Sequence, residues 1–133
     1  MRFVLLALAV GVAAGCQVVD PIVPSPTPEG VALRATRGAA DTINITLSNR
    51  STGSVGYNLC ASGLERRSGS SWAVVPVHRV CTMELRLLSR GQDVSYRSVY
   101  LAPLVRGEYR VTTGVEMPGG AWRVVQSNAF TVN

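Results

Sequence analysis

The chain lacks lysine altogether. Its 13 basic residues are all arginine, and against eight acidic residues they give a formal net charge of +5 over 133 residues. A guanidinium group suits phosphate and carboxylate partners, but a GC-rich genome that codes arginine in place of lysine explains the absence more simply. The arginines are spread along the chain, whereas a nucleic-acid-binding protein typically shows a basic patch or a recognisable motif. We therefore expect no nucleic-acid partner.

Histidine is almost as scarce, since His78 is the only one. A Ser–His or Cys–His nucleophile would need it beside the nucleophile with an orienting acid, and the sequence contains no serine-elbow motif. The acidic residues are single and scattered, without the spacing of a calcium loop. We interpret His78 as a solvated surface residue and expect no catalytic residue, metal or cofactor. The sequence therefore predicts that the protein is not an enzyme.

The apolar run near the start is too short for a membrane-spanning helix, which needs about 20 residues. Residues 3–15 (FVLLALAVGVAAG) form a charge-free stretch of thirteen residues after Met1 and Arg2. A positive start, a short apolar run and small residues at its end are typical of a secretory signal. We interpret residues 1–15 as a signal peptide.

The end of this run, Ala13-Ala14-Gly15-Cys16, resembles the lipobox of bacterial lipoproteins, although the family prefers leucine where Ala13 stands. The resemblance implies that the Cys16 thiol receives a diacylglycerol and that Cys16 begins the mature chain, held in the membrane by its lipid. It also places the protein in the bacterial cell envelope, with its domain periplasmic or extracellular. Because Gln17 follows in place of an aspartate, the outer membrane is expected if the cell has one. An ordinary signal, cleaved to leave a free thiol, is the alternative.

Proline is concentrated just after Cys16. Four prolines, Pro21, Pro24, Pro26 and Pro28, fall within residues 16–30. Proline restricts φ and removes a backbone donor, so a segment rich in it is extended and semi-rigid. We expect residues 16–30 to be a lipid-anchored linker that holds the following domain off the membrane.

From residue 31 onward the hydrophobic pattern has a period of two. Residues 42–49 (TINITLSN) alternate without a break, which is typical of a half-buried strand. Glycine- and serine-rich turns separate further short runs, and no window keeps a helical period. Residues 31–133 are therefore expected to form an all-β sandwich of about 7–8 antiparallel strands. The predicted core comprises Ile43, Ile45, Leu47, Tyr57, Leu59, Trp72, Leu85, Tyr109, Val111, Phe130 and Val132.

The stretches ITLSNRSTGSVGYNLC, WAVVP, RGEYRV and SNAFTV together resemble the bacterial immunoglobulin-like domains that are common in secreted lipoproteins. The resemblance covers about residues 31–133 and implies an immunoglobulin-like sandwich whose tyrosine at position 109 packs at the edge of the core. The intracellular proteinase inhibitor family has a related layout. The resemblance to immunoglobulin-like domains supplies no catalytic residues.

Cys60 and Cys81 remain once Cys16 is assigned to lipid. An exported chain enters an oxidising compartment, where paired cysteines generally become disulfides. The interval between them contains a predicted hairpin, so a bond across its two flanks is geometrically reasonable. A metal or thiol pair is the alternative, but zinc would need two more ligands and only His78 is near in sequence.

The expected role is that of a non-enzymatic binding or structural module with an unidentified envelope or extracellular protein partner. Sandwich domains bind through end loops or free sheet edges. We therefore name Arg50 in loop 50–53, Arg67 in loop 67–71 and Gly119 in loop 117–120 as candidate binding residues. A protease inhibitor that presents one of these loops is the alternative function.

Overall fold

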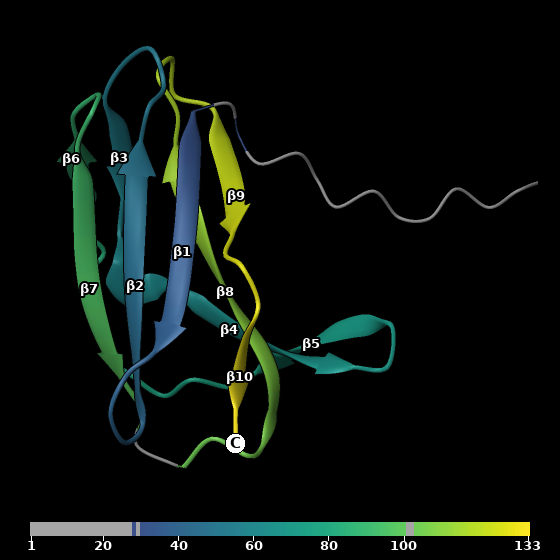
Figure 1. The fold of residues 1–133 in the computed structure, drawn as a ribbon. Helices are drawn as coiled ribbons and strands as arrows, with labels where there is room; N and C mark the ends of the chain where they lie inside the picture. Colours follow the sequence, from purple (N-terminus) through teal and green to yellow (C-terminus); the bar gives the residue numbers. More distant parts are fainter. Residues whose placement is uncertain (1–27, 29, 101–102) are drawn as a thin grey trace, which may run out of the picture.

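A computed structural model describes residues 28, 30–100 and 103–133 of the chain. Within them, ten strands and one short 3-10 helix make two antiparallel sheets packed face to face (Figure 1). The prediction of an all-β sandwich is confirmed. The predicted signal peptide, Cys16 and most of the predicted linker lie outside the described residues.

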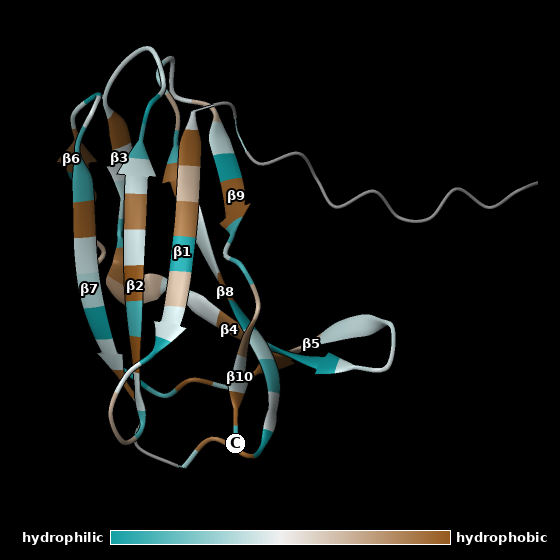
Figure 2. Cartoon of the chain, viewed as in Figure 1, coloured by the Kyte–Doolittle hydropathy of each residue, from teal (hydrophilic) through white to brown (hydrophobic). Residues whose placement is uncertain are grey.

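Sheet A contains three strands in the order β1 (Val31–Arg37), β2 (Thr42–Asn49) and β7 (Asp93–Val99). The alternation seen in the sequence of β2 corresponds to its burial, because every second residue from Ile43 to Asn49 points into the core. Figure 2 shows the same alternation as bands of different hydropathy along β1 and β2. β2 is the middle strand and pairs with both neighbours.

Sheet B is built around β8 (Gly107–Glu116), the longest strand. One edge of β8 pairs with β4 and then β3, and the other pairs with β10 and then β9. Beyond these, β5 pairs with β4, and β6 pairs with β3. The bounds are β3 (Val55–Tyr57), β4 (Gly63–Ser68), β5 (Ser71–Val75), β6 (Arg86–Leu88), β9 (Trp122–Gln126) and β10 (Phe130–Val132).

The described residues form ten strands rather than the predicted seven or eight. On each side of β8, the neighbouring stretch of chain is interrupted and therefore forms two short strands instead of one. The 3-10 helix η1 (Leu59–Ala61) separates β3 from β4. Residues 127–129 separate β9 from β10, and here the chain turns toward sheet A. The Asn128 side chain accepts a hydrogen bond from the Ala35 amide at 3.0 Å and donates one to the Ala35 carbonyl at 2.9 Å. This amide substitutes for a strand partner and joins the edge of β1 to the other sheet.

Most of the predicted core lies between the sheets, and Phe130 packs against it while partly buried. Trp72 and Leu85 were predicted wrongly. Trp72 pairs with Arg67 across the β4–β5 hairpin, on the side of sheet B away from the core. Leu85 precedes β6 and is 41% exposed, because Leu88 is the β6 residue that faces inward. The predicted residues that are buried are Ile43, Ile45, Leu47, Tyr57, Leu59, Tyr109, Val111 and Val132.

The predicted Cys60–Cys81 disulfide is present, with the two Cα atoms 5.7 Å apart. Cys60 lies in η1, just before β4, and Cys81 lies in the segment after β5. The bond therefore closes the base of the β4–β5 hairpin. Arg79, close to Cys81 in sequence, donates hydrogen bonds to the Ser62 carbonyl and to the Ser98 hydroxyl of β7. The segment that carries Cys81 is thereby attached to β7 and to the residue that precedes β4.

Candidate functional site

The structure brings two of the three predicted loops together and leaves the third apart. Loops 50–53 and 117–120 lie at the same end of the sandwich (Figure 1), and a Cβ at Gly53 would come within 3.1 Å of the Pro118 ring. Gly119 has a φ of +94°, a left-handed conformation that favours glycine. Residues 67–71 instead form the tip of the β4–β5 hairpin, which projects from the body of the molecule (Figure 1).

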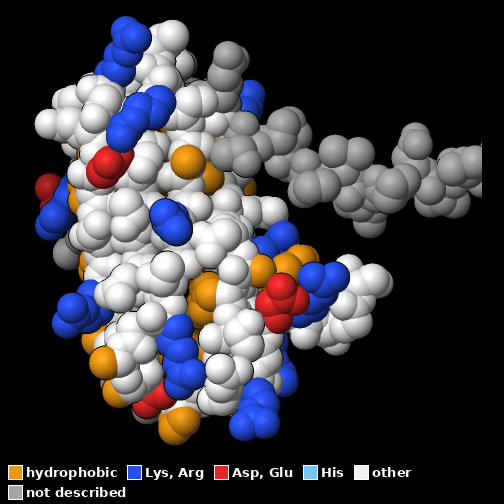
Figure 3. All heavy atoms as spheres, viewed as in Figure 1, with side chains coloured by type: hydrophobic (Ala, Val, Ile, Leu, Met, Phe, Trp, Pro, Cys, Tyr) orange, Lys and Arg blue, Asp and Glu red, His pale blue; other side chains and the backbone are white. Residues whose placement is uncertain are grey.

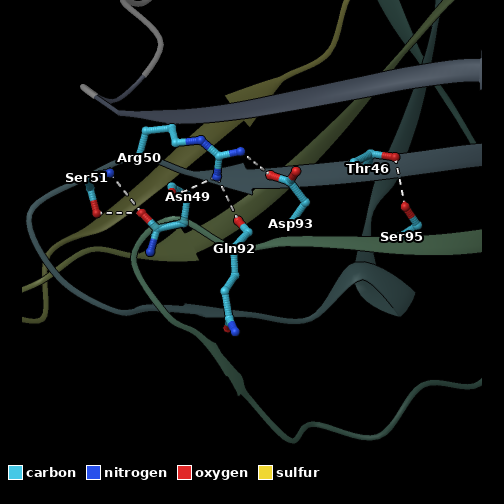
Figure 4. Close-up of polar contacts among 7 residues, drawn as sticks. All are labelled: Thr46, Asn49, Arg50, Ser51, Gln92, Asp93 and Ser95. Atoms are coloured by element: carbon cyan, nitrogen blue, oxygen red, sulfur yellow. Dashed lines mark hydrogen bonds and ion pairs between the residues drawn. The ribbon is translucent and has the colours of Figure 1, made fainter.

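Arg50 is engaged within the fold. One of its guanidinium nitrogens pairs with the Asp93 carboxylate at 2.9 Å, and the other donates to the Asn49 and Gln92 carbonyls at 3.2 Å (Figure 4). These contacts attach the start of loop 50–53 to the start of β7. The side chain is half-exposed, but both of its terminal guanidinium nitrogens already have acceptors within the domain. Its geometry therefore indicates a role in holding the loop.

Arg67 is engaged in a similar way on the projecting hairpin. It forms an ion pair with Glu108 at 3.2 Å, and its guanidinium carbon lies 5.8 Å from the centroid of the Trp72 ring. These contacts attach the hairpin to β8 and cover one side of the tryptophan. Of the three predicted binding residues, Arg67 alone borders an exposed apolar surface.

That surface lies on the outer face of sheet B. Gly114, Trp122 and Leu87 illustrate why: each occupies an outward position of its strand, opposite in phase to the buried residues of β8, β9 and β6. Both tryptophans of the chain lie there. We call this surface the tryptophan face. Its large apolar side chains are those of Trp72, Val74, Met83, Leu85, Leu87, Trp122 and Val124.

The outer face of sheet A has a different composition. Its cross-strand pairs place threonine opposite serine and asparagine opposite arginine, and Thr46 and Ser95 share a hydrogen bond of 3.0 Å (Figure 4). Figure 3, in which sheet A faces the viewer, shows basic side chains scattered over a mainly uncharged surface. Because polar-out alternation is normal for a solvated antiparallel sheet, sheet A needs no partner. Sheet B departs from this pattern.

The tryptophan face contains a groove of about 470 Å³. Its floor is formed by small residues on neighbouring strands, including Gly63 and Gly114, and its sides include Trp122 and Met83. The Trp122 ring lies across Gly114, where an added Cβ would be 2.5 Å from the ring. Met83 is 95% exposed and Trp122 is 53% exposed. Large exposed apolar side chains therefore flank a hollow that only small residues permit.

The charges on the tryptophan face are largely satisfied within it. The Arg110 Nε contacts the Glu65 carboxylate at 2.5 Å, and another Arg110 nitrogen donates to the Gln126 side chain at 3.0 Å. The Arg110 guanidinium also lies 4.5 Å from the centroid of the Trp72 ring. A cation over an aromatic face is attracted by the ring quadrupole. The arginine thus joins β4, β5, β8 and β9 without offering an unpaired charge.

This face could not be predicted from sequence, because two adjacent apolar residues in a strand do not reveal which of them points toward the core. Val124 and Val125 are neighbours in β9, and Leu87 and Leu88 are neighbours in β6, so either could face the core. The structure buries Val125 and Leu88. The available signal was the glycine at position 114, whose missing side chain leaves room for an outward-facing tryptophan on the neighbouring strand.

A second hollow of about 380 Å³ opens near the hairpin and the end of β7. Arg66, His78 and Tyr100 contribute to its lining. His78 is exposed, as expected. Among the described residues, the buried Tyr100 hydroxyl and Arg66 Nε have no hydrogen-bond partner. The hollow is mainly apolar and contains two donors, but its lining residues flank positions 101–102, which lie outside the described part of the chain.

Within residues 28, 30–100 and 103–133, no group of three or more histidine, cysteine or acidic residues could hold a metal ion. The same residues contain no helix long and apolar enough to cross a membrane. Comparison with family models, curated proteins and solved structures adds a single finding. Nothing matches this chain. The candidate site therefore rests on its own geometry.

Proposed function

We propose that this chain is a non-enzymatic, lipid-anchored protein of the bacterial cell envelope whose sandwich domain binds another protein. The anchor is the diacylglycerol on Cys16, and it rests on the short apolar run that ends in Ala13-Ala14-Gly15-Cys16. More than one acyl chain is needed for stable membrane attachment, and the lipobox supplies them on one residue. Gln17 favours the outer membrane where the cell has one.

The domain is proposed to be immunoglobulin-like. In addition to the two-sheet architecture, the Tyr109 hydroxyl donates a 2.6 Å hydrogen bond to the Val105 carbonyl four residues earlier. A tyrosine near the start of a late strand, bonded back to the preceding backbone, is the tyrosine corner of immunoglobulin-like sandwiches. The paired cysteines also suit an exported domain, because disulfides persist in oxidising compartments.

The observation that carries the binding role is the exposure of the tryptophan face. Scattered apolar residues are normal on protein surfaces, but contiguous apolar patches indicate interaction sites. Here Trp122, Val124 and Met83 surround one groove, and the opposite outer face is polar. Aromatic residues and methionine are also enriched where proteins contact one another. We therefore place the binding surface on the tryptophan face rather than on the end loops.

Photo-crosslinking in the native host tests this proposal. A photoreactive amino acid at Val124 lies on the tryptophan face, and the same amino acid at Val99 lies on the outer face of sheet A as a matched control. The two valines are similarly exposed, at 58% and 60%. We expect protein adducts from position 124 and few from position 99. Equal labelling from both positions, or none from position 124, would contradict the proposal.

Protease inhibition remains a second candidate because of one observation. The β4–β5 hairpin projects from the sandwich (Figure 1), and the residues of its tip are exposed. A projecting loop is what an inhibitor presents to an active site. An inhibitor should slow a secreted protease at stoichiometric concentration and lose this effect when Gly69 and Ser70 are replaced. No inhibition across a broad panel of proteases would exclude it.

A further inference from the structure

We propose that the tryptophan face binds a second copy of this chain, in a dimer with two-fold symmetry. The dimer rests on the proposed function in one respect, namely that this face is the binding surface. The partner it adds is a second copy of the chain. A two-fold interface uses the same patch on both subunits, so the patch must be complementary to itself. Three properties of the face meet this requirement.

The first property is shape. Trp122 and Val124 on β9 form a ridge along one side of the groove, with the Trp122 ring covering Gly114 and Gly63 left on the open floor. A two-fold rotation about an axis between ridge and groove places the ridge of each copy over the groove of the other. The exposed Met83 on the far side of the groove then contacts the inserted ridge. One surface thus carries both a ridge and a groove, as a self-complementary patch requires.

The second property is charge. The chain carries a net charge of +5, so two copies repel each other through most of their surfaces. The outward positions of β4 and β8 instead hold two arginines, Arg67 and Arg110, with Glu65, Glu108 and Glu116. Both arginines form ion pairs within the face. Two copies that meet through this face therefore bring no unpaired positive charges against each other. An acidic partner would be attracted instead to the basic surfaces outside this face.

The third property is size. The 10 residues of β8 span about 33 Å at about 3.3 Å per residue. Four neighbouring strand positions at about 4.8 Å spacing cover roughly 19 Å in the other direction. The flat area is roughly 600 Å², and the relief of the side chains brings the accessible area near the roughly 800 Å² per partner of a standard specific interface. The face is therefore large enough for a stable dimer without help from the loops.

The test is the mass of the full mature chain in solution, measured by light scattering after detergent extraction with the detergent mass subtracted. We expect a dimer at tens of micromolar that dissociates on dilution. Val124→Arg puts an unpaired charge at the centre of the interface, and burial of such a charge is strongly unfavourable. We expect it to weaken dimerisation at least about 100-fold. Val99→Arg adds the same charge to the outer face of sheet A and should leave the dimer unchanged.

Met83→Glu is the second variant, because a side chain that is 95% exposed contributes little to folding. It should also weaken the dimer, with thermal unfolding of the dissociated subunit near that of the parent. A parent protein that is monomeric at 100 micromolar, or equal effects of Val124→Arg and Val99→Arg, would overturn the dimer. If the protein is monomeric but the photoreactive residue at position 124 still crosslinks to a different protein, the dimer is refuted and the proposed function stands. A monomer without such adducts would refute the proposed function as well.

Discussion

Asn49 is a buried polar side chain whose hydrogen-bonding groups are all used within the fold. It is fully buried, and its amide donates to the Gly53 carbonyl at 2.8 Å and to the Leu88 carbonyl at 2.9 Å. Its side-chain oxygen accepts hydrogen bonds from the Ser51 amide and hydroxyl (Figure 4). Both donors and both lone pairs are thus in use. One side chain organises loop 50–53 and ties it to β6.

Replacement of this side chain tests that role. Asn49→Ala removes four hydrogen bonds and leaves the buried Leu88 carbonyl without this partner, so we expect a loss of roughly 3 kcal/mol in the free energy of unfolding. Asn44→Ala is the matched control, because Asn44 lies on the same strand but faces outward. It should change stability by less than about 0.5 kcal/mol. Equal effects in urea denaturation would contradict the role of Asn49.

The hydrogen bond of the Tyr109 hydroxyl gives a second prediction at this scale. Tyr109→Phe keeps the buried ring but removes the hydrogen bond to the Val105 carbonyl. We expect a loss of about 1 kcal/mol, the usual net value of such a bond. Tyr96→Phe serves as the control, since Tyr96 is half-buried on β7 and no described residue accepts a hydrogen bond from it. If the two variants unfold at the same urea concentration, this hydrogen bond contributes nothing to stability.

Single residues could be predicted where the pattern left no choice. Ile43, Ile45 and Leu47 alternate with polar residues, so only one face could be buried, and the structure buries all three. Trp72 offered a choice, because a large aromatic residue fits a core or an exposed cation–π contact equally well in sequence. The arginines that stack on it come from β4 and β8. This placement depends on strand pairing, which composition does not reveal.

Among the elements, the β4–β5 hairpin depends most on a covalent bond. It projects from the sandwich (Figure 1). The disulfide between Cys60 and Cys81 closes its base. Because few buried apolar residues come from β5, packing alone constrains this element weakly. The disulfide therefore restricts a segment that the core does not fully hold.

Removal of the disulfide should cost stability without altering the sheets. For a sequence separation of 21 residues, the chain-entropy model gives about 3 kcal/mol. We expect the double variant Cys60→Ser/Cys81→Ser to lose this amount in urea denaturation, and the reduced parent protein to behave in the same way. Peptide mapping without reductant should also link the two cysteines. Identical unfolding of the parent and the variant would contradict the assigned role.

The longer strands could be predicted from sequence, and the shorter ones could not. Residues 42–49 and the run from Tyr109 to Val115 alternate over their whole lengths, and both are strands in the structure. β3 and β6 have three residues each, which is too few for a period to be measured. They form because β3 pairs with both β8 and β6. Long-range pairing of this kind leaves no local signal.

At the scale of the whole molecule, the two outer faces are unlike. Sheet A presents serine, threonine and asparagine to solvent, whereas sheet B presents the tryptophan face. If residues 16–30 form the proposed linker, the domain can turn either face toward a neighbour. Anchoring would also confine copies to one membrane surface, which raises their effective concentration and favours even a weak dimer. The proposed anchor and the proposed interface thus support each other.

The anchor at Cys16 is the central claim of this account, and the intact mass of the protein extracted from membranes tests it most directly. We predict a chain that begins at Cys16 and carries added acyl mass, and we predict that Cys16→Ser abolishes both the added mass and the membrane association. An unmodified mature chain recovered from the medium, with a free thiol at Cys16, would contradict the account.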